Sequence, residues 1–196
     1  MSGQPYPVKE TRKEIVFIRH AESQGNLDGV WMGRSDGPLS EAGEATLDQL
    51  GKRLSDWDFD AVISSSLTRA RRTAASFADE FEIDDDFIEI DLGRWEGMPF
   101  IDVQEKHGEE LQEAVTTRTL PMGGTGESIE QVGIRAIGAV DRLFERMGDN
   151  ERVAVVTHGG FLQAVLHRHM AGHDRRVHAF TANTGIIRIV HQFGRP

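Results

Sequence analysis

Two histidines in this sequence each directly follow a short run of apolar residues. His20 comes after residues 14–18 (EIVFI) with Arg19 between them, and His158 comes after residues 152–157 (RVAVVT). In a parallel α/β sheet the loops that leave the strands converge at one edge, and ligands bind there. Either histidine alone fits a structural role. Together they favour one pocket that holds both imidazoles and the Arg19 guanidinium.

A third cation is expected at the same place. Arg69 lies about one turn into a helix that is predicted to begin near Ser66, close to the end that carries partial positive charge. A pocket with Arg19, Arg69 and a helix terminus suits a dianion, and phosphate fits because guanidinium binds its oxygens in bidentate fashion. Arg71 and Arg72 are predicted to be surface groups.

Apolar runs alternate with amphipathic segments along most of the chain. Strands are predicted at residues 14–18, 61–65, 152–157 and 185–190, and helices at residues 40–56, 66–80, 127–147 and 161–171. This alternation is typical of a largely parallel sheet with helices on both faces and right-handed crossovers. We therefore predict an α/β fold, a three-layer α/β/α sandwich with a mostly parallel central sheet.

The alternation breaks between Gly97 and Gly126, where Pro99, Pro121 and three glycines surround a short polar helix candidate. We predict a helical insertion or lid here, over the C-terminal ends of the strands. Residues 1–13 are polar and are predicted to form a flexible N-terminal segment. Residues 14–196 are then expected to form a single domain.

Five segments of the chain carry a recognisable series of motifs. They are RHAESQGN at 19–26, SSSLTRARRTA at 64–74, FIEIDLGRWEG at 87–97, GES at 126–128 and THG at 157–159. The first three resemble the patterns RHGE-x-x-x-N, S-x-L-x-R-A-x-x-T-A and L-x-E-x-x-x-G-x-W-E-G of the histidine phosphatase superfamily, also called phosphoglycerate-mutase-like. A later NTG at 183–185 is similar to a small-residue turn of that family, and the resemblance extends from about residue 15 to residue 189.

The resemblance implies that His20 is the nucleophile and becomes phosphorylated on a ring nitrogen. It implies that the phosphoryl oxygens are held by Arg19, Asn26, Arg69 and His158. General chemistry agrees, because a nucleophilic imidazole must be neutral and flanking guanidinium charges lower its pKa below the usual ~6.5. The same charges stabilise the equatorial oxygens of the transferring group.

The family's proton donor corresponds to Glu89. Glu96 is expected to support Glu89 without contacting the substrate itself. No metal and no cofactor are implied. Ala21 replaces the usual glycine, and Met32 stands where many relatives place a polar residue, so the pocket beyond the phosphate is expected to be less polar. The shorter chain and its LG-x-WEG sequence favour a phosphatase over a mutase.

The function predicted from the sequence is a metal-independent phosphomonoesterase. It would hydrolyse a small phosphorylated metabolite through a phosphohistidine intermediate on His20. Two alternatives stay open, a phosphoglycerate mutase and a catalytically weak phospho-ligand-binding protein that uses the same pocket. Residues 27–37 and the insertion at 97–126 are expected to determine which ester binds.

Three other patterns in the sequence resemble known kinds of functional site. Residues 33–37 (GRSDG) match the G-x-S-x-G nucleophile elbow, but no apolar strand leads into them, so a substrate-side loop is predicted. The histidines 167, 169, 173 and 178 are interpreted as surface groups, with Gly172 ending the helix. The acidic residues 82–86 are interpreted as a solvated loop without a metal.

Composition excludes several classes of protein. The chain has 196 residues, a formal net charge of −10 and no cysteine. The charge argues against a nucleic-acid partner, and the missing cysteines exclude disulfides, thiolate zinc sites and a cysteine nucleophile. No apolar run suggests a signal peptide or a membrane partner. We expect a cytoplasmic protein whose partner is a small phosphorylated substrate, with a homodimer left open.

Overall fold

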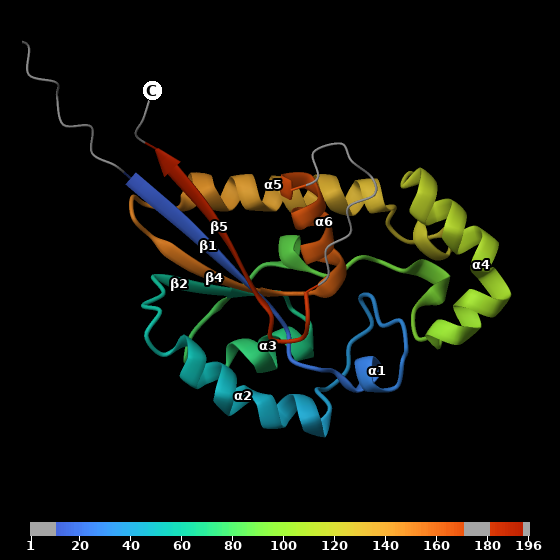
Figure 1. Cartoon of the computed structure of the whole chain (residues 1–196), viewed down its shortest axis with the longest axis horizontal. Helices are drawn as coiled ribbons and strands as arrows, with labels where there is room; N and C mark the ends of the chain where they lie inside the picture. Colours follow the sequence, from blue (N-terminus) through green and yellow to red (C-terminus); the bar gives the residue numbers. More distant parts are fainter. Residues whose placement is uncertain (1–10, 171–180, 194–196) are drawn as a thin grey trace, which may run out of the picture.

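A mostly parallel sheet forms the centre of the computed structural model, which describes residues 11–170 and 181–193 (Figure 1). Within these residues the sheet has five strands, β1 (Thr11–Arg19), β2 (Ala61–Ser64), β3 (Glu82–Ile83), β4 (Arg152–Thr157) and β5 (Ile186–Phe193). Their order is β3-β2-β4-β1-β5. Only β5 runs antiparallel to its neighbour, β1, while the other pairs are parallel.

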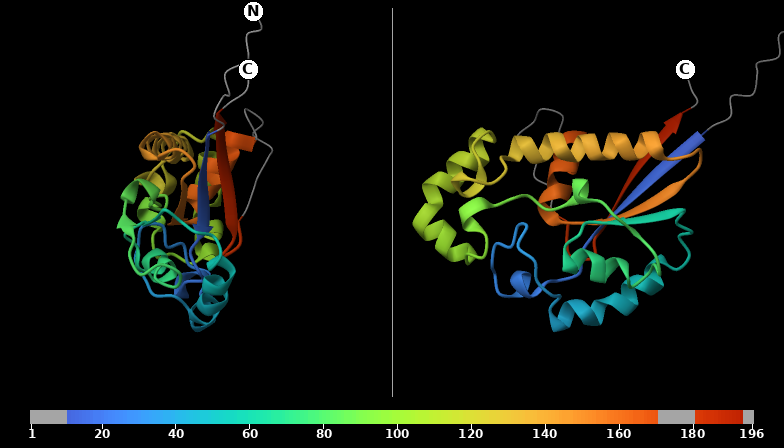
Figure 2. Two further views of the ribbon diagram at one scale, coloured as in Figure 1. Left: turned by 90° about the vertical axis from the view of Figure 1, so that its left-hand side faces the viewer. Right: turned by 180° about the vertical axis from the view of Figure 1, so that it is seen from behind.

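Helices cover both faces of this sheet (Figures 1 and 2). On one face lie α2 (Glu41–Leu54) and α3 (Thr68–Ala74), and on the other lie α5 (Ile129–Arg146) and α6 (Gly159–Met170). The predicted three-layer α/β/α sandwich is therefore confirmed. No helix in the described part of the chain is both long enough and apolar enough to cross a membrane.

The central strand β1 explains why helices are needed on both faces. Its residues Ile15 and Phe17 pack with side chains of α5 and α6, whereas Val16 and Ile18 pack with side chains of α2 and α3. Successive strand residues point to opposite faces, and all four side chains are fully buried. A continuous apolar run in β1 is what a strand buried on both faces requires.

The segment between residues 97 and 126 is helical, as predicted, but its helix is longer than expected. Helix α4 (Phe100–Thr117) has 18 residues, departs from helical backbone angles at His107 and is capped by Arg118 in the left-handed conformation. It is held by an apolar cluster of its own, which includes Trp95, Val103 and Ala114. Figure 1 shows α4 beside the main sandwich, beyond one end of the sheet.

Two predicted boundaries and the interpretation of one loop were wrong. Strand β1 begins at Thr11, so residues 11–13 are not part of a flexible segment, because they pair with residues 191–193 of β5. Helix α3 ends at Ala74, well before residue 80, and Phe77 then packs against Phe59 with ring centroids 6.0 Å apart. The acidic loop contains the short strand β3, which pairs with β2. Residues 1–10 and Gly172 lie outside the described residues.

Candidate active site

The register of the sheet brings the two predicted histidines together. Arg19 and Thr157 are partners at the ends of β1 and β4, and the His20 amide donates to the Thr157 carbonyl at 2.9 Å. Each histidine follows its strand directly, so the side chains leave the same edge of the sheet. Their ring centroids are 5.1 Å apart, with the planes inclined at 54°.

The His20 imidazole is buried and has one defined hydrogen bond. Its Nδ1 lies 2.6 Å from the carbonyl oxygen of Ala21. A carbonyl can only accept, so Nδ1 carries the proton and Nε2 keeps its lone pair. Burial, followed by the charges of Arg69 and Arg19, lowers the pKa of His20 to about 3. The ring is therefore neutral at physiological pH, as a nucleophile must be.

Two guanidinium groups line the pocket beside His20, and backbone carbonyls orient both of them; Arg69 is buried and Arg19 is partly buried. Arg69 donates to the carbonyls of Gly33 (2.6 Å) and Ser35 (2.9 Å), and Arg19 donates to that of Thr181 (2.5 Å). Burial lowers the pKa of both arginines, which the carboxylate of Glu89 opposes. The two guanidinium groups supply positive charge that attracts a phosphate, while the carboxylates of Glu89, Asp36 and Glu96 surround Arg69.

Two buried nitrogens of this site have no hydrogen-bond partner, Nε of Arg19 and Nδ1 of His158; among the described residues only one other such atom occurs, in Trp95. The other ring nitrogen of His158, Nε2, lies 2.6 Å from the Ser65 hydroxyl. Burial, followed by the charges of His20 and Arg69, lowers the pKa of His158 well below its usual value. Buried polar atoms normally have partners. Arg19 lines the pocket, so its Nε suits a ligand that brings acceptor oxygens, whereas His158 is fully buried behind the residues that line the pocket.

Asn26 lies in helix α1 (Gln24–Leu27), and Ser23 caps this helix. The Asn26 Oδ1 accepts from the Ser23 amide (3.2 Å) and from the side chain of Asn183 (3.2 Å). Asn183 also donates to the His20 carbonyl at 3.0 Å. Asn26 lines the pocket. Because its Oδ1 already accepts two hydrogen bonds, its Nδ2 group is available to donate to a phosphoryl oxygen.

The Glu89 carboxylate lies at the beginning of helix α6. It accepts from the amides of Gly160 and Phe161, both at 3.0 Å. A Cβ added at residue 160 would lie 2.5 Å from Glu89 Oε1, so a larger residue there would displace this carboxylate. Arg135 of α5 donates to the carbonyls of Asp86 and Ile88 and to that of Glu89. Arg135 therefore holds the segment that carries Glu89.

Glu96 does not contact Glu89, contrary to the expectation from the sequence. Its carboxylate instead accepts from the amides of Arg34 (2.8 Å), Ser35 (2.6 Å) and Leu92 (3.2 Å) and from the Ser35 hydroxyl. Residues 33–35 are the loop whose carbonyls hold Arg69. Glu96 therefore holds the loop that orients the Arg69 guanidinium, and it also bonds to residue 92, three positions after Glu89.

The structure also places the G-x-S-x-G pattern and the first of the four C-terminal histidines. Residues 33–37 form the loop just described, and Met32 and Gly33 line the pocket, as expected for a substrate-side loop. His167 lines the pocket, contrary to its interpretation as a surface group, and its Nε2 lies 3.2 Å from a guanidinium nitrogen of Arg118. The side chain of residue 169 and residues 173 and 178 lie outside the described part. In the described residues no three His, Asp or Glu side chains are grouped as a metal ion requires.

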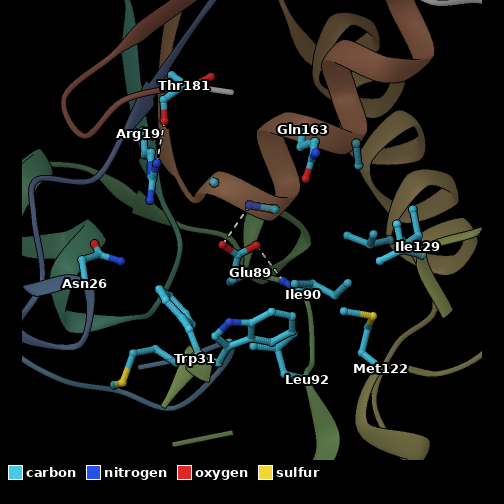
Figure 3. A pocket seen from close by; sticks show the side chains of 18 of the residues that line it. Arg19, Asn26, Trp31, Glu89, Ile90, Leu92, Met122, Ile129, Gln163 and Thr181 are labelled. Atoms are coloured by element: carbon cyan, nitrogen blue, oxygen red, sulfur yellow. Dashed lines mark hydrogen bonds between the residues drawn. The ribbon is translucent and has the colours of Figure 1, made fainter. Parts of the chain in front are cut away.

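The pocket has a volume of about 710 Å³ and two chemically different ends (Figure 3). Arg19, Asn26 and Glu89 form the polar end with His20 and Arg69. The other end is mainly apolar, and Figure 3 shows Trp31, Leu92, Met122 and Ile129 around it. The two guanidinium groups and the imidazole at the polar end suit an anionic ligand.

Comparison with known proteins agrees with this chemistry. A family model described as histidine phosphatase superfamily (branch 1) matches residues 15–196, and the chain belongs to this family. Phosphoserine phosphatase 1 of Hydrogenobacter thermophilus is 34% identical over 149 residues, which are 74% of this chain and 70% of that protein. The comparisons thus support a phosphatase.

Two further relatives cover more of the chain. The probable phosphoglycerate mutase GpmB of Erwinia tasmaniensis is 29% identical over 189 residues, 91% of this chain and 85% of that protein. The solved structure of Bacillus stearothermophilus YhfR is similar with a TM-score of 0.79 and 26% identity, covering 90% of each chain. Both matches extend over nearly the whole fold.

Sequence reasoning missed three residues that hold the site together. Ser65 and Asn183 lie within segments that carried the family resemblance, yet no role was predicted for either. Arg135 lies in no matched motif at all. Its position on an otherwise amphipathic helix gives no sign that it binds the carbonyls of residues 86–89, since those contacts span 46 to 49 residues of sequence.

Proposed function

We propose that the protein is a phosphomonoesterase that hydrolyses a small phosphorylated metabolite through a phosphohistidine on His20. The observation that carries this proposal is the geometry around His20: Nδ1 of its buried ring lies 2.6 Å from the Ala21 carbonyl, which assigns the lone pair to Nε2 of a neutral ring, beside the guanidinium groups of Arg19 and Arg69. An imidazole in this state is a nucleophile placed where negative charge is stabilised.

In the first step Nε2 of His20 attacks phosphorus, the P–N bond forms and the ester P–O bond breaks. Arg19, Asn26 and Arg69 bind the phosphoryl oxygens. His158 adds a donor if the Ser65 hydroxyl donates to Nε2, because Nδ1 then carries the ring proton. The charges of the two arginines stabilise the transferring group most strongly in the transition state.

Glu89 acts on the leaving oxygen and then on water. In its protonated form it gives a proton to the departing alkoxide, and the resulting carboxylate then takes a proton from the water that attacks phosphohistidine. This second attack breaks the P–N bond and releases inorganic phosphate. Glu89 lies close enough to Arg19 and Arg69 for its carboxylate to raise the pKa of both guanidinium groups.

The proposal is tested by trapping the intermediate. Wild type and His20→Asn are incubated with a phosphate ester labelled with ³²P, in a chelator, and then quenched. We expect label on wild type that is lost in acid and kept in alkali, as for a phosphoramidate, and none on His20→Asn. The matched control His107→Asn, a histidine on α4, should label normally. Label retained by His20→Asn would overturn the assignment.

A phosphoglycerate mutase is the second candidate, and the similarity to the protein named GpmB favours it. The two activities differ in the acceptor of the phosphoryl group on His20, which is water in hydrolysis and a phosphoglycerate in transfer. With 3-phosphoglycerate as substrate, we expect release of inorganic phosphate rather than the 2-isomer. The cytoplasmic location and the homodimer stay predictions.

A further inference from the structure

The half of the pocket that faces the alcohol of the ester is built mainly from apolar side chains. Its walls come from three separate segments: the loop after α1, residues 90–92, and α4 with the helices that follow. The apolar lining residues are Val30, Trp31, Met32, Ile90, Leu92, Phe100, Val115, Met122, Ile129 and Val132. Most small metabolite phosphates carry carboxylates or hydroxyls, for which such walls offer no partner.

Aromatic rings give one of these walls a defined shape. Trp31 meets Trp95 edge to face, with centroids 5.7 Å apart and planes at 84°, and meets Phe100 at 5.9 Å and 73°. Edge-to-face contacts of this kind are favourable and hold the rings in place. The Trp31 ring is therefore supported on two sides and presents a flat apolar surface to a ligand.

Cations near this half are largely paired within the protein. Arg34 forms salt bridges with Glu127 (3.1 Å) and Asp91 (3.9 Å). Apart from Arg19, His20, Arg69 and Glu89, the charged or titratable groups that line the pocket are Arg118 and His167, which contact each other. Thr116 and Gln163 are uncharged polar residues of this lining, and most of the remaining surface that the alcohol would meet consists of rings and aliphatic chains.

The volume of the pocket and the exposure of its apolar side chains also favour a large apolar ligand. A volume of about 710 Å³ is in the range of sites for drug-sized ligands, ~300–1,000 Å³, and is far larger than a three-carbon acid needs. Phe100 and Val115 line the pocket and yet are 46% and 44% exposed. Exposed apolar side chains around a concave site indicate a ligand that covers them.

We propose that the leaving alcohol of the natural substrate carries an uncharged, apolar ring system that packs against Trp31 and Phe100. This inference rests on the proposed phosphatase function and specifies its substrate class. Phosphorylated amino acids and phosphoglycerates are then poor substrates, since their charged groups lose water in the pocket without gaining a partner.

The test compares primary alkyl esters, so that acidity of the leaving alcohol contributes little. We expect kcat/KM for 2-(2-naphthyl)ethyl phosphate to exceed that for ethyl phosphate and for phosphoserine at least about tenfold. A preference for phosphoserine or 3-phosphoglycerate would overturn the substrate class and leave the phosphatase function standing. Hydrolysis of none of the esters would instead overturn the phosphatase function itself.

Two variants test the wall directly. Phe100→Ala should lower the ratio of kcat/KM for the naphthyl ester over phosphoserine several-fold, and Val115→Lys should lower it at least about tenfold by placing a cation in the apolar half. Val115 is exposed on α4, so the chain accepts a lysine there. Ile134→Lys makes the same change on α5 outside the pocket lining and should leave the ratio unchanged. A ratio that neither pocket variant alters would overturn the proposal.

Discussion

The two ends of the pocket differ in how the protein holds them. At the phosphate end, backbone carbonyls bind the functional groups directly: Ala21 binds His20, Thr181 binds Arg19, and Gly33 and Ser35 bind Arg69. At the alcohol end, side chains from separate segments pack loosely enough to leave a large cavity. The first arrangement fixes orientation, and the second leaves room for variation in the substrate.

This difference has a physical reason. Stabilising the charge of a transferring phosphoryl group requires donors that are already oriented, because reorienting them during the reaction costs free energy. Burial of an apolar leaving group depends on area and is non-directional, so it tolerates small shifts of the wall. A rigid sheet edge therefore suits the phosphate end, and the inserted α4 suits the alcohol end.

The largest effect that separates the two ends is expected for Glu89→Gln. Loss of the proton donor should lower kcat/KM, which covers only the steps up to release of the alcohol, about 10³-fold for an alkyl phosphate but less than about tenfold for 4-nitrophenyl phosphate, whose leaving group needs no proton. Steady-state kinetics with both esters measure the contrast. Glu110→Gln, an exposed glutamate that pairs with Arg94, is the control. Equal losses with the two esters would contradict the assigned role.

Arg69→Lys is expected to act on the phosphate end alone. A lysine cannot satisfy the Gly33 and Ser35 carbonyls and a phosphoryl oxygen together, so kcat/KM should fall about 10²-fold. Because the loss concerns the phosphoryl group, it should be similar for naphthylethyl, ethyl and 4-nitrophenyl phosphate. Arg71→Lys on the exposed side of α3 should have no effect. A loss confined to one ester would show that Arg69 contacts the alcohol instead.

Glu96→Gln is expected to have a smaller effect, which passes through Arg69. The amide keeps the size of the carboxylate but weakens its bonds to the amides of Arg34 and Ser35, so kcat/KM should fall about tenfold. A double-mutant cycle with Arg69→Lys measures the coupling. We expect the second substitution to cost little once Arg69 is altered. Fully additive losses would indicate that Glu96 acts on another part of the enzyme.

Burial of the neutral His20 is expected to make stability depend on pH. Its pKa is about 3 in the folded chain and about 6.5 when unfolded, so below pH 6.5 the unfolded state binds more protons. As the pH decreases below 6.5, this group should therefore lower the free energy of unfolding by roughly 1.4 kcal/mol per pH unit. Urea unfolding at pH 7, 6 and 5 should give a shallower decline for His20→Asn. Parallel curves would contradict the buried neutral state.

Local patterns in the sequence were enough to predict much of this molecule. The apolar runs at 14–18 and 152–157 predicted β1 and β4, because a strand buried on both faces needs continuous apolar residues. Ser40 predicted the beginning of α2, where its side chain accepts from the Gly43 amide. The placement of His20 and His158 after two strands predicted that their rings would share one edge of a sheet.

Contacts between distant segments were decided only by the tertiary structure. Glu96 was expected to support Glu89, but it binds residues 34 and 35, which are 61 to 62 positions away in the sequence. Arg69 is in turn oriented by carbonyls 34 and 36 positions away. Spacing along the chain encodes which side chains share a helix face or a strand edge. It does not encode which loop a carboxylate meets, because that depends on how the insertion and α5 pack against the sheet.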